Sequence, residues 1–358
     1  MPLEIKEEYL KALRKAYHAN NLTLYLGAGV SAGNGLPSWD KLVLAMYFSA
    51  IDRDEVVKGL SPFPNYLFAI AEWHLERRNE PLDITSRKIR LLLEDENRFW
   101  GKLHKTLYTV FTTDGCPAVQ LPTQELLLQK NATLKAVTNL CAEKNANGTL
   151  VRSVITYNYD NLLELGLGQH LTKPIWKASQ RPKRDQLPIY HVHGYVPIQG
   201  RGSKVKELVF TEDQYYLAAQ NAYSWGNLIQ IEYLSNTVGL MIGLSLTDRN
   251  MRRLLDALKK TPLPPECYVI LQRPRWAKAE SHDLNRINLQ AKKYFDEFSH
   301  SGLKTGNKEG EQINEIISGV EAADLDMEER LLKELGVRPI WYQEHAEVPQ
   351  IINQIMSP

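Results

Sequence analysis

Cysteine is scarce in this chain of 358 residues. Three cysteines occur, Cys116, Cys141 and Cys267, and no two of them form a Cys-x-x-Cys pair. Three thiols cannot build a disulfide scaffold, and they cannot supply the four ligands of a four-cysteine zinc ribbon within one chain. The sequence therefore predicts a fold without a metal, stabilised by its hydrophobic core in a reducing cytoplasm.

Long apolar runs and an excess of either charge are also missing. No run approaches the roughly 18 to 20 residues that cross a bilayer, and residues 1–20 carry charges throughout, unlike a secretion signal. The 43 basic residues are balanced by 42 acidic ones, which argues against binding the nucleic-acid backbone through bulk charge. We expect neither a membrane partner nor direct nucleic-acid binding.

The periodicity of the remaining residues predicts alternating helices and strands. Apolar residues at helical spacing predict a helix over 3–19, several helices between 39 and 147, and a last helix over 348–355. Short apolar segments next to turn residues predict strands that begin at Leu22 and span 150–156, 188–192, 238–243, 268–271 and 338–342. We expect no strand between 39 and 147. The charged stretch 277–326, with a break at 301–306, reads as exposed helices whose charges are solvated.

A glycine-rich loop follows the first predicted strand, and its glycines are Gly27, Gly29, Gly33 and Gly35. Glycine lets the backbone turn sharply and brings its N–H groups close to phosphate oxygens, with no Cβ in the way. Such a loop alone fits a plain structural turn equally well.

Polar residues end two further predicted strands, at Asn158 to Asp160 and at His193-Gly194. Ligands of open parallel sheets bind outside the carboxyl ends of the strands, so these ends and the glycine loop could meet in one crevice.

Four segments together resemble the sirtuin-like family of NAD-consuming Rossmann enzymes. They occur in the order of the family's motifs, each at the end of a predicted strand, and they read Gly27-Ala28-Gly29-Val30-Ser31 with Gly35-Leu36-Pro37, Thr156-Tyr157-Asn158-Tyr159-Asp160, His193-Gly194, and Gly243-Leu244-Ser245-Leu246. The resemblance implies an α/β fold, a Rossmann-like parallel sheet with an inserted helical subdomain and no zinc ribbon. It covers about half of the chain. We expect the core at 1–39 and 148–276, the insert at 40–147, and a helical C-terminal region with a last core strand at 277–358.

The resemblance also implies the site residues. The residues that would contact the NAD pyrophosphate are Gly27, Ala28, Gly29 and Ser31. Asn158, Asp160 and His193 would surround the nicotinamide ribose. Gly243 and Ser245 would lie along the adenosine half.

The chain departs from the deacylating members of that family. Those enzymes carry a zinc module after the His-Gly motif, whereas residues 195–240 contain no cysteine. They also read Asp-Phe-Arg after their Gly-Ile-Pro, whereas Ser38-Trp39-Asp40 follows Pro37 here. Trp39 could still supply an aromatic wall for the ligand. The late asparagine near the adenine ribose has no convincing match around 269–272. The pattern is closer to the zinc-free branch that includes NAD-depleting effectors of bacterial anti-phage defence.

Cleaving the bond between nicotinamide and the ribose builds up positive charge on the sugar and needs a base. Histidine suits this role because its unperturbed pKa lies near 6.5. His193 is the candidate base, with a hydrogen-bonded strand-end histidine as the alternative. Asn158 would orient a water or a ribose hydroxyl, or cap the strand. Asp160 would stabilise the developing cation, cap the next helix, or do both. His191 points to the same strand face as His193 and either supports it or is only structural.

Three functions remain open at this point. The first is an NAD glycohydrolase that releases nicotinamide and ADP-ribose, as a regulated effector that uses NAD as its substrate and no metal. Family analogy then implies a homo-oligomer and a separate regulatory subunit, such as an ATPase, an Argonaute-type protein or a nucleotide-sensing protein. The second is a non-catalytic NAD or ADP-ribose binding module that signals by assembly. The third, protein deacylation, is disfavoured by the missing zinc module.

Overall fold

The computed structural model describes residues 5–51, 64–112, 119–146, 148–168, 170–262, 264–273 and 307–357. Cys116, the predicted break at 301–306 and the first part of the charged stretch, 277–306, lie outside these ranges.

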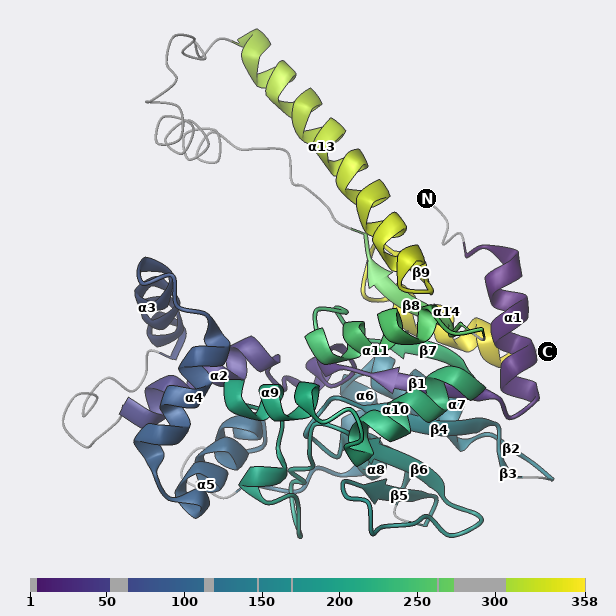
Figure 1. The fold of residues 1–358 in the computed structure, drawn as a ribbon, viewed down its shortest axis with the longest axis horizontal. Helices are drawn as coiled ribbons and strands as arrows, with labels where there is room; N and C mark the ends of the chain where they lie inside the picture. The colour runs from purple at the N-terminus through teal and green to yellow at the C-terminus, as the bar shows by residue number, and fades with distance from the viewer. Residues whose placement is uncertain are drawn as a thin grey trace.

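A seven-stranded sheet forms the centre of the molecule, and every strand runs parallel to its neighbours (Figure 1). In spatial order the strands are β5 (Thr172–Ile175), β6 (Leu187–His191), β4 (Val151–Thr156), β1 (Leu22–Leu26), β7 (Val238–Ile242), β8 (Glu266–Gln272) and β9 (Val337–Tyr342). The predicted α/β class is confirmed.

Two strand expectations from the sequence need correction. The sequence pattern missed β5, whose four residues include Lys173 and Pro174 and so lack an apolar run. The stretch 39–147 was expected to hold no strand, but β2 (Lys144–Asn145) pairs antiparallel with β3 (Gly148–Thr149) at its end. Both strands of this hairpin have only two residues, which is too short for a period-two pattern to be visible.

The strand order reverses at β1. On one side of β1 the strands follow in the order β4, β6 and β5, and on the other side in the order β7, β8 and β9. Leu26 pairs with Thr156 of β4 and with Ile242 of β7, so the three strands end at the same level. In open parallel sheets, ligands bind at the carboxyl ends beside such a reversal.

One face of the sheet is covered by helices from the two ends and from the middle of the chain. These helices are α1 (Glu7–His18), α7 (Ala132–Ala142), α8 (Leu162–Leu167) and α14 (Glu347–Met356). Their buried residues share one hydrophobic cluster with Leu24 and Leu26 of β1. The alternating side chains of β1 explain this arrangement, since Tyr25 points to the opposite face and belongs to a different cluster.

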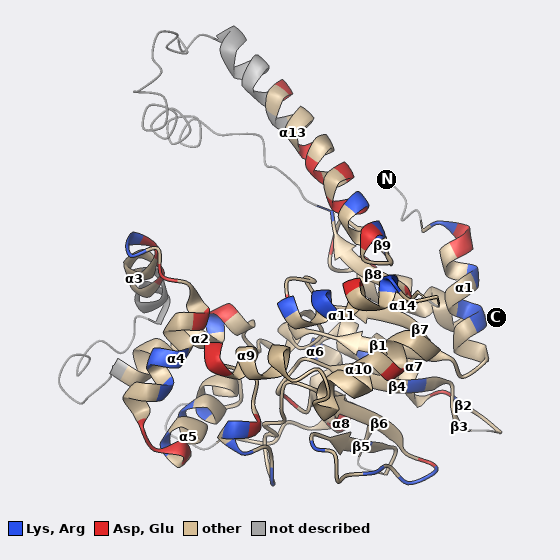
Figure 2. Cartoon of the chain, in the orientation of Figure 1, with Lys and Arg blue, Asp and Glu red and all other residues tan. Residues whose placement is uncertain are grey.

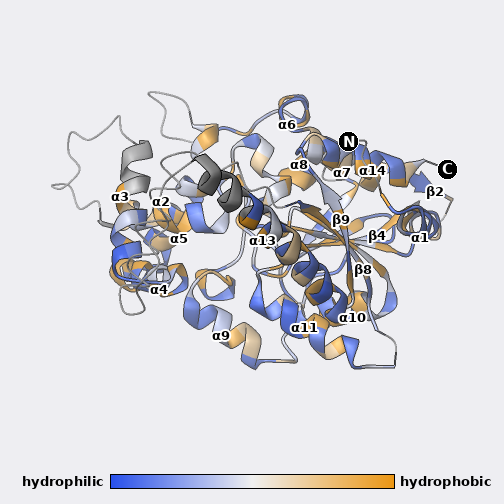
Figure 3. Cartoon of the chain, turned by 90° about the horizontal axis from the view of Figure 1, so that it is seen from above, coloured by the Kyte–Doolittle hydropathy of each residue, from blue (hydrophilic) through white to orange (hydrophobic). Residues whose placement is uncertain are grey.

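The other face is covered by α10 (Trp225–Asn236), α11 (Arg249–Lys259) and the last turn of α13 (Asn307–Glu334). The view from above shows the sheet between its two helical layers (Figure 3), and Figure 1 shows α13 extending away from the body of the molecule. Leu332, at the end of α13, is buried in the second cluster.

Further helices follow the glycine loop. They are α2 (Trp39–Ile51), α3 (Pro64–Arg77), α4 (Leu82–Leu93) and α5 (Glu96–Leu107), followed by the short α6 (Gln124–Lys130). Helices α2 to α5 lie beyond the carboxyl ends of the strands, at the left of Figure 1. Short 3-10 turns span Ala28–Val30, Ala32–Asn34, Thr109–Phe111 and Val205–Glu207. The domain boundaries drawn at 39, 147 and 276 stay predictions.

Ion pairs connect these outer helices to α9 (Glu212–Gln220). Arg87 and Arg90 of α4 approach Glu212 and Asp213 at 3.2 and 2.7 Å. Figure 2 shows Lys and Arg mixed with Asp and Glu over the surface helices, as the balanced composition predicts. Of the helices in the described ranges, none is long and apolar enough to cross a membrane.

The packing of α14 yields a first prediction. Ile352 is fully buried in the cluster under the sheet, so Ile352→Ala should lower the free energy of unfolding by about 2–5 kcal/mol through lost contacts and a residual cavity. Urea unfolding followed by circular dichroism measures this change. Ile316→Ala on α13, where the side chain is 65% exposed, is the matched control and should change stability by less than about 0.5 kcal/mol. Equal effects of the two substitutions would contradict the assigned packing.

Candidate functional site

The glycine loop after β1 lies directly against the end of β7. A Cβ on Gly27 would approach the carbonyl oxygen of Gly243 to 2.4 Å, and one on Gly29 would approach the Cα of Gly243 to 2.7 Å. Gly243 itself has φ +67°, a left-handed conformation that favours glycine. These glycines are therefore required by the contact between two backbones.

The hydrogen bonds of the loop refine its expected role as a phosphate cradle. The amides of Gly27 and Gly29 donate to the carbonyls of Ile242 and Gly243, both at 3.0 Å. The amides of Val30 and Ser31 donate within the loop, to Gly27 and Ala28. From 27 to 31, Ala28 has the amide that makes no hydrogen bond to any described residue. A phosphate oxygen would thus meet one available amide in this stretch.

Asn158 connects the end of β4 to the glycine loop. Its Nδ2 donates to the carbonyl of Gly27 at 3.0 Å and to Oγ of Ser31 at 3.2 Å. Because a carbonyl oxygen can only accept, the atom facing Gly27 is the amide nitrogen and the orientation of the side chain is determined. Oδ1 of Asn158 accepts no hydrogen bond from the described part of the chain.

Ser31 links Asn158 to Asp160. Its hydroxyl donates to the carboxylate of Asp160 at 2.9 Å from Oδ2, and the amide of Leu162 donates to Oδ1 at 3.1 Å. The latter bond confirms the expected contact with the start of the next helix. Burial raises the pKa of Asp160 from its ordinary 3.8 to about 6, although the Leu162 amide and the Ser31 hydroxyl oppose this change.

His193 lies after β6 with its ring buried between aromatic side chains. The rings of Tyr157 and Tyr215 stand perpendicular to it, with centroids at 4.9 and 5.6 Å. The next residue, Gly194, has φ +104°, a conformation that side-chain-bearing residues rarely adopt. Burial lowers the pKa of His193, an effect that the nearby carboxylate of Asp248 partly opposes. His193 is therefore neutral, and able to accept a proton, at neutral pH.

Asp248 makes two contacts at the start of α11. Its Oδ1 accepts the amide of Met251 at 2.7 Å and so caps the helix. Its Oδ2 also lies 3.5 Å from Nε2 of His193. A carboxylate favours the proton on the nitrogen that faces it, which leaves Nδ1 of His193 as the basic atom. The nearness of Asp248 to His193 follows from the pairing of distant strands and has no local sequence signal.

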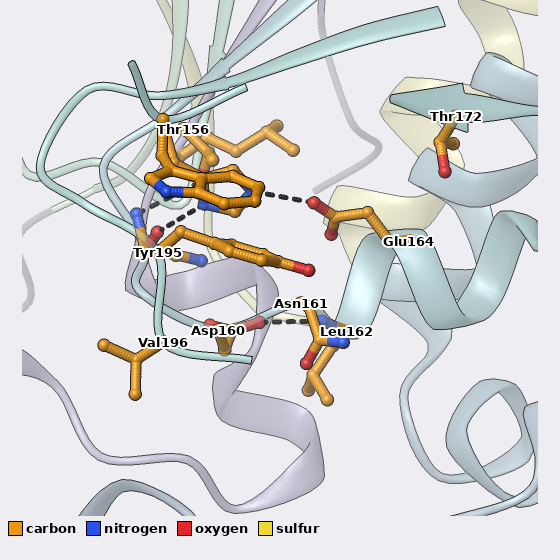
Figure 4. A network of polar contacts seen from close by, with 12 residues as sticks. Thr156, Asp160, Asn161, Leu162, Glu164, Thr172, Tyr195 and Val196 are labelled. Carbon is orange, nitrogen blue, oxygen red and sulfur yellow. Dashed lines mark hydrogen bonds and ion pairs between the residues drawn. The ribbon is translucent and has the colours of Figure 1, made fainter. Parts of the chain in front are cut away.

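A buried pair lies behind Asn158. Nδ1 of His191 lies 3.1 Å from the carbonyl oxygen of Asn158, and Nε2 lies 2.7 Å from Oε1 of Glu164 on α8. The ring of Tyr195 contacts that of His191 in a tilted arrangement, with centroids 4.5 Å apart and planes at 58°. Figure 4 shows the Tyr195 ring between Glu164 and Asp160. Sequence reasoning identified His191 as a candidate support but did not include Glu164.

Trp39 is half-buried at the start of α2, after Pro37. Its ring centroid lies 6.3 Å from that of Tyr215, which in turn contacts His193. Its Nε1 is buried and has no hydrogen-bond partner among the described residues. The indole therefore offers a donor near the aromatic surroundings of His193.

Ser245 is exposed on the loop after β7, and its hydroxyl lies 2.7 Å from that of Thr247. The following residue, Leu246, is buried and has φ +55°. A leucine in this left-handed region is strained, by on the order of 1–3 kcal/mol, and such residues occur often at ligand sites.

Two cavities lie along these strand ends. His193 lines the larger, of about 220 Å³, together with Val192, Gln214, Trp225, Gln230 and Asn250 among others. The smaller, of about 10 Å³, is lined by Ser31, Asn158, Asp160, Glu164 and His191 with apolar neighbours. Its volume is about that of one water molecule. Of the three predicted catalytic side chains, Asn158 and Asp160 thus line the smaller cavity and His193 lines the larger one.

The comparison with protein families agrees with this arrangement. Residues 152–298 match the family model of the SIR2-like domain. The sirtuin-like resemblance of the motifs is thereby confirmed. The matched range of the SIR2-like domain includes Asn158, Asp160, His193, Gly243 and Ser245, whereas the glycine loop at Gly27 precedes it.

The chain is also similar to a protein named NAD(+) hydrolase ThsA from Cytobacillus dafuensis. The two are 23% identical over 260 residues, which cover 71% of this chain and 41% of the relative. The aligned part of this chain thus spans about two fifths of the length of that protein. Within the described ranges, no group of three or more His, Cys, Asp and Glu side chains is placed to hold a metal ion.

The contact between the two loops yields a second prediction. Gly27 has φ −122° and ψ −176°, which alanine adopts freely, so only the added methyl group of Gly27→Ala is costly. We expect a loss of about 1–3 kcal/mol of stability, because Gly243 or Leu244 must move. In Gly101→Ala, the matched control on α5, the methyl group meets no other part of the fold within 4 Å, and stability should rise by about 0.5–1 kcal/mol. Thermal unfolding of the two variants measures both effects, and an undisturbed Gly27→Ala protein would contradict the contact.

The buried carboxyl group of Asp160 yields a third prediction. A carboxyl whose pKa is higher in the folded than in the unfolded chain stabilises the fold at low pH, and this contribution is lost as the pH rises through about 6. Asp160→Asn removes the burial of a charge, so at pH 8 it should be more stable than the native chain by up to about 3 kcal/mol. The gain should shrink toward pH 4. Urea unfolding at both pH values tests this, and a difference that stays constant with pH would show that Asp160 does not titrate as expected.

Proposed function

We propose that this chain cleaves NAD to nicotinamide and ADP-ribose. The observation that carries the proposal is the chain of hydrogen bonds from Gly27 through Asn158 and Ser31 to Asp160, at the reversal of the strand order. It joins the glycine loop to polar residues within the matched SIR2-like range. The relative named NAD(+) hydrolase supports the same reaction.

Breaking the bond between nicotinamide and the ribose builds positive charge on the sugar. The reaction then needs an oriented water or ribose hydroxyl and a base that is neutral at the working pH. We assign the base to His193, whose lowered pKa keeps it unprotonated. Asn158 would orient the hydroxyl or water through its available Oδ1. Asp160, when ionised, adds negative charge on the same side.

The remaining predicted residues would bind the substrate. The amide of Ala28, which has no hydrogen-bond partner among the described residues, would bind the pyrophosphate, with Gly27, Gly29 and Ser31 shaping the loop. Pro37 and Trp39 would border the nicotinamide end, where the buried Nε1 of Trp39 has no partner among the described residues.

Gly243 and Ser245 would lie along the adenosine half. The strained Leu246 directly follows Ser245, which supports a binding role for this loop.

An unregulated enzyme of this kind would deplete the NAD of its own cell. We therefore propose a regulated, NAD-depleting effector in bacterial anti-phage defence, with NAD as substrate and no metal. Its regulation would come from homo-oligomerisation and from a separate protein subunit, for which an ATPase, an Argonaute-type or a nucleotide-sensing protein are the candidates.

Incubation of the purified protein with NAD, alone and with its genomic neighbours, tests the proposal by chromatography of released nicotinamide. Asn158→Ala and His193→Ala should each reduce the rate by about 10²–10⁴-fold, the range of an oriented acid-base group. Tyr223→Ala, at a side chain 84% exposed, is the control and should keep the native rate.

Release that survives both substitutions would refute the assigned site. Binding of NAD, measured by calorimetry without any nicotinamide release, would refute hydrolysis and identify a binding module.

A further inference from the structure

The buried Glu164–His191 pair has no role in the chemistry proposed above, yet it touches the residue on which that chemistry depends. The side chains of His191 and Glu164 are 0% and 7% exposed. Two ionisable groups out of contact with water are costly unless each finds hydrogen-bond partners. Such a pair, between the end of β6 and α8, calls for an explanation beyond packing.

The direction of the hydrogen bonds follows from the partners of His191. The carbonyl oxygen of Asn158 can only accept, so Nδ1 of His191 must carry a proton and donate it. Nε2 faces the carboxyl group of Glu164 at 2.7 Å, so this contact also holds a proton, located on one of the two groups. Glu164 thereby keeps His191 in the form that donates to Asn158.

The side chain of Asn158 is held independently. Both hydrogens of Nδ2 are used, toward Gly27 and Ser31, and the Asn158 amide donates to Oγ1 of Thr156 at 3.1 Å. With the carbonyl held by His191, every polar atom of Asn158 except Oδ1 has a partner. A residue fixed in this way presents one acceptor in one direction.

The surroundings make the pair rigid. The Tyr195 ring contacts His191 at a tilt, with centroids 4.5 Å apart, and its other contact is a stack on Trp176, with centroids 4.8 Å apart. His191 is also the last residue of β6, and its backbone pairs with Thr156 of β4. The donor nitrogen therefore has little freedom to leave the Asn158 carbonyl.

We propose that Glu164 and His191 are positioning residues that fix the backbone of Asn158 and so aim its Oδ1 at the reacting ribose or water. This inference rests on the proposed NAD cleavage for its consequence in catalysis, but the positioning itself is a property of the fold. Neither residue touches the substrate.

Two substitutions of His191 separate positioning from packing. The amide nitrogen of asparagine reaches the place of Nδ1, and that of glutamine reaches the place of Nε2, because the two side chains differ by one methylene. His191→Asn should keep the bond to the Asn158 carbonyl and retain kcat within about threefold of the native value. His191→Gln should keep a bond to Glu164 but lose the one to Asn158, and kcat should fall by about 10–100-fold with KM little changed.

A substitution at Glu164 gives a second, independent comparison. In Glu164→Gln the amide can donate to Nε2 of His191, which then donates through Nδ1 as before, so kcat should be largely retained. Glu164→Met fills the same space without a hydrogen bond, and kcat should fall about tenfold or more. Thermal unfolding confirms that each variant is folded.

Hydrogen exchange of the segment 156–162, followed by mass spectrometry, gives a readout that needs no activity. Faster exchange in His191→Gln than in His191→Asn supports the positioning role, and equal exchange together with equal kcat overturns it. If the native protein releases no nicotinamide, the proposed function fails, and the exchange data alone still decide on the positioning.

Discussion

The close approach of the Gly27–Gly29 loop to Gly243 is the constraint on which the site depends. It brings the backbone at the end of β1 within hydrogen-bond distance of the end of β7, with no room for a Cβ on either side. Once the loop is held there, the Gly27 carbonyl faces β4 and accepts the side chain of Asn158. At the reversal of the strand order, the ends of β1, β4 and β7 are thus held together by fixed contacts.

Burial of polar groups distinguishes this edge of the sheet from the rest of the core. Asp160, Glu164, His191 and His193 are all less than a tenth exposed. A buried carboxylate lowers stability at neutral pH, and here its cost is offset only in part by the Ser31 hydroxyl and the Leu162 amide. Sites that retain such groups commonly trade stability for function. The apolar layers on both faces of the sheet therefore stabilise the structure, and the buried polar groups at the carboxyl ends of the strands lower its stability.

Sequence periodicity was reliable where strands are long and apolar. Strands β1, β4, β6, β7, β8 and β9 were predicted within a few residues, since buried parallel strands read as continuous apolar runs. It failed at β5, where Lys173 and Pro174 interrupt the pattern, and at the β2–β3 hairpin. The motif residues were named correctly as strand-end residues. The predicted phosphate cradle was too simple, because the Gly27 and Gly29 amides donate to the β7 end.

The sequence alone determined which residue types stand at the strand ends, the α/β class and the sirtuin-like resemblance, because these depend on local order along the chain. Only the tertiary structure decided which of these residues meet. Asp248 reaches His193, and Glu164 reaches His191, across 55 and 27 positions of the chain. Such contacts arise from the order and register of the strands. No local pattern records that order, because parallel pairing is set by packing of the whole sheet.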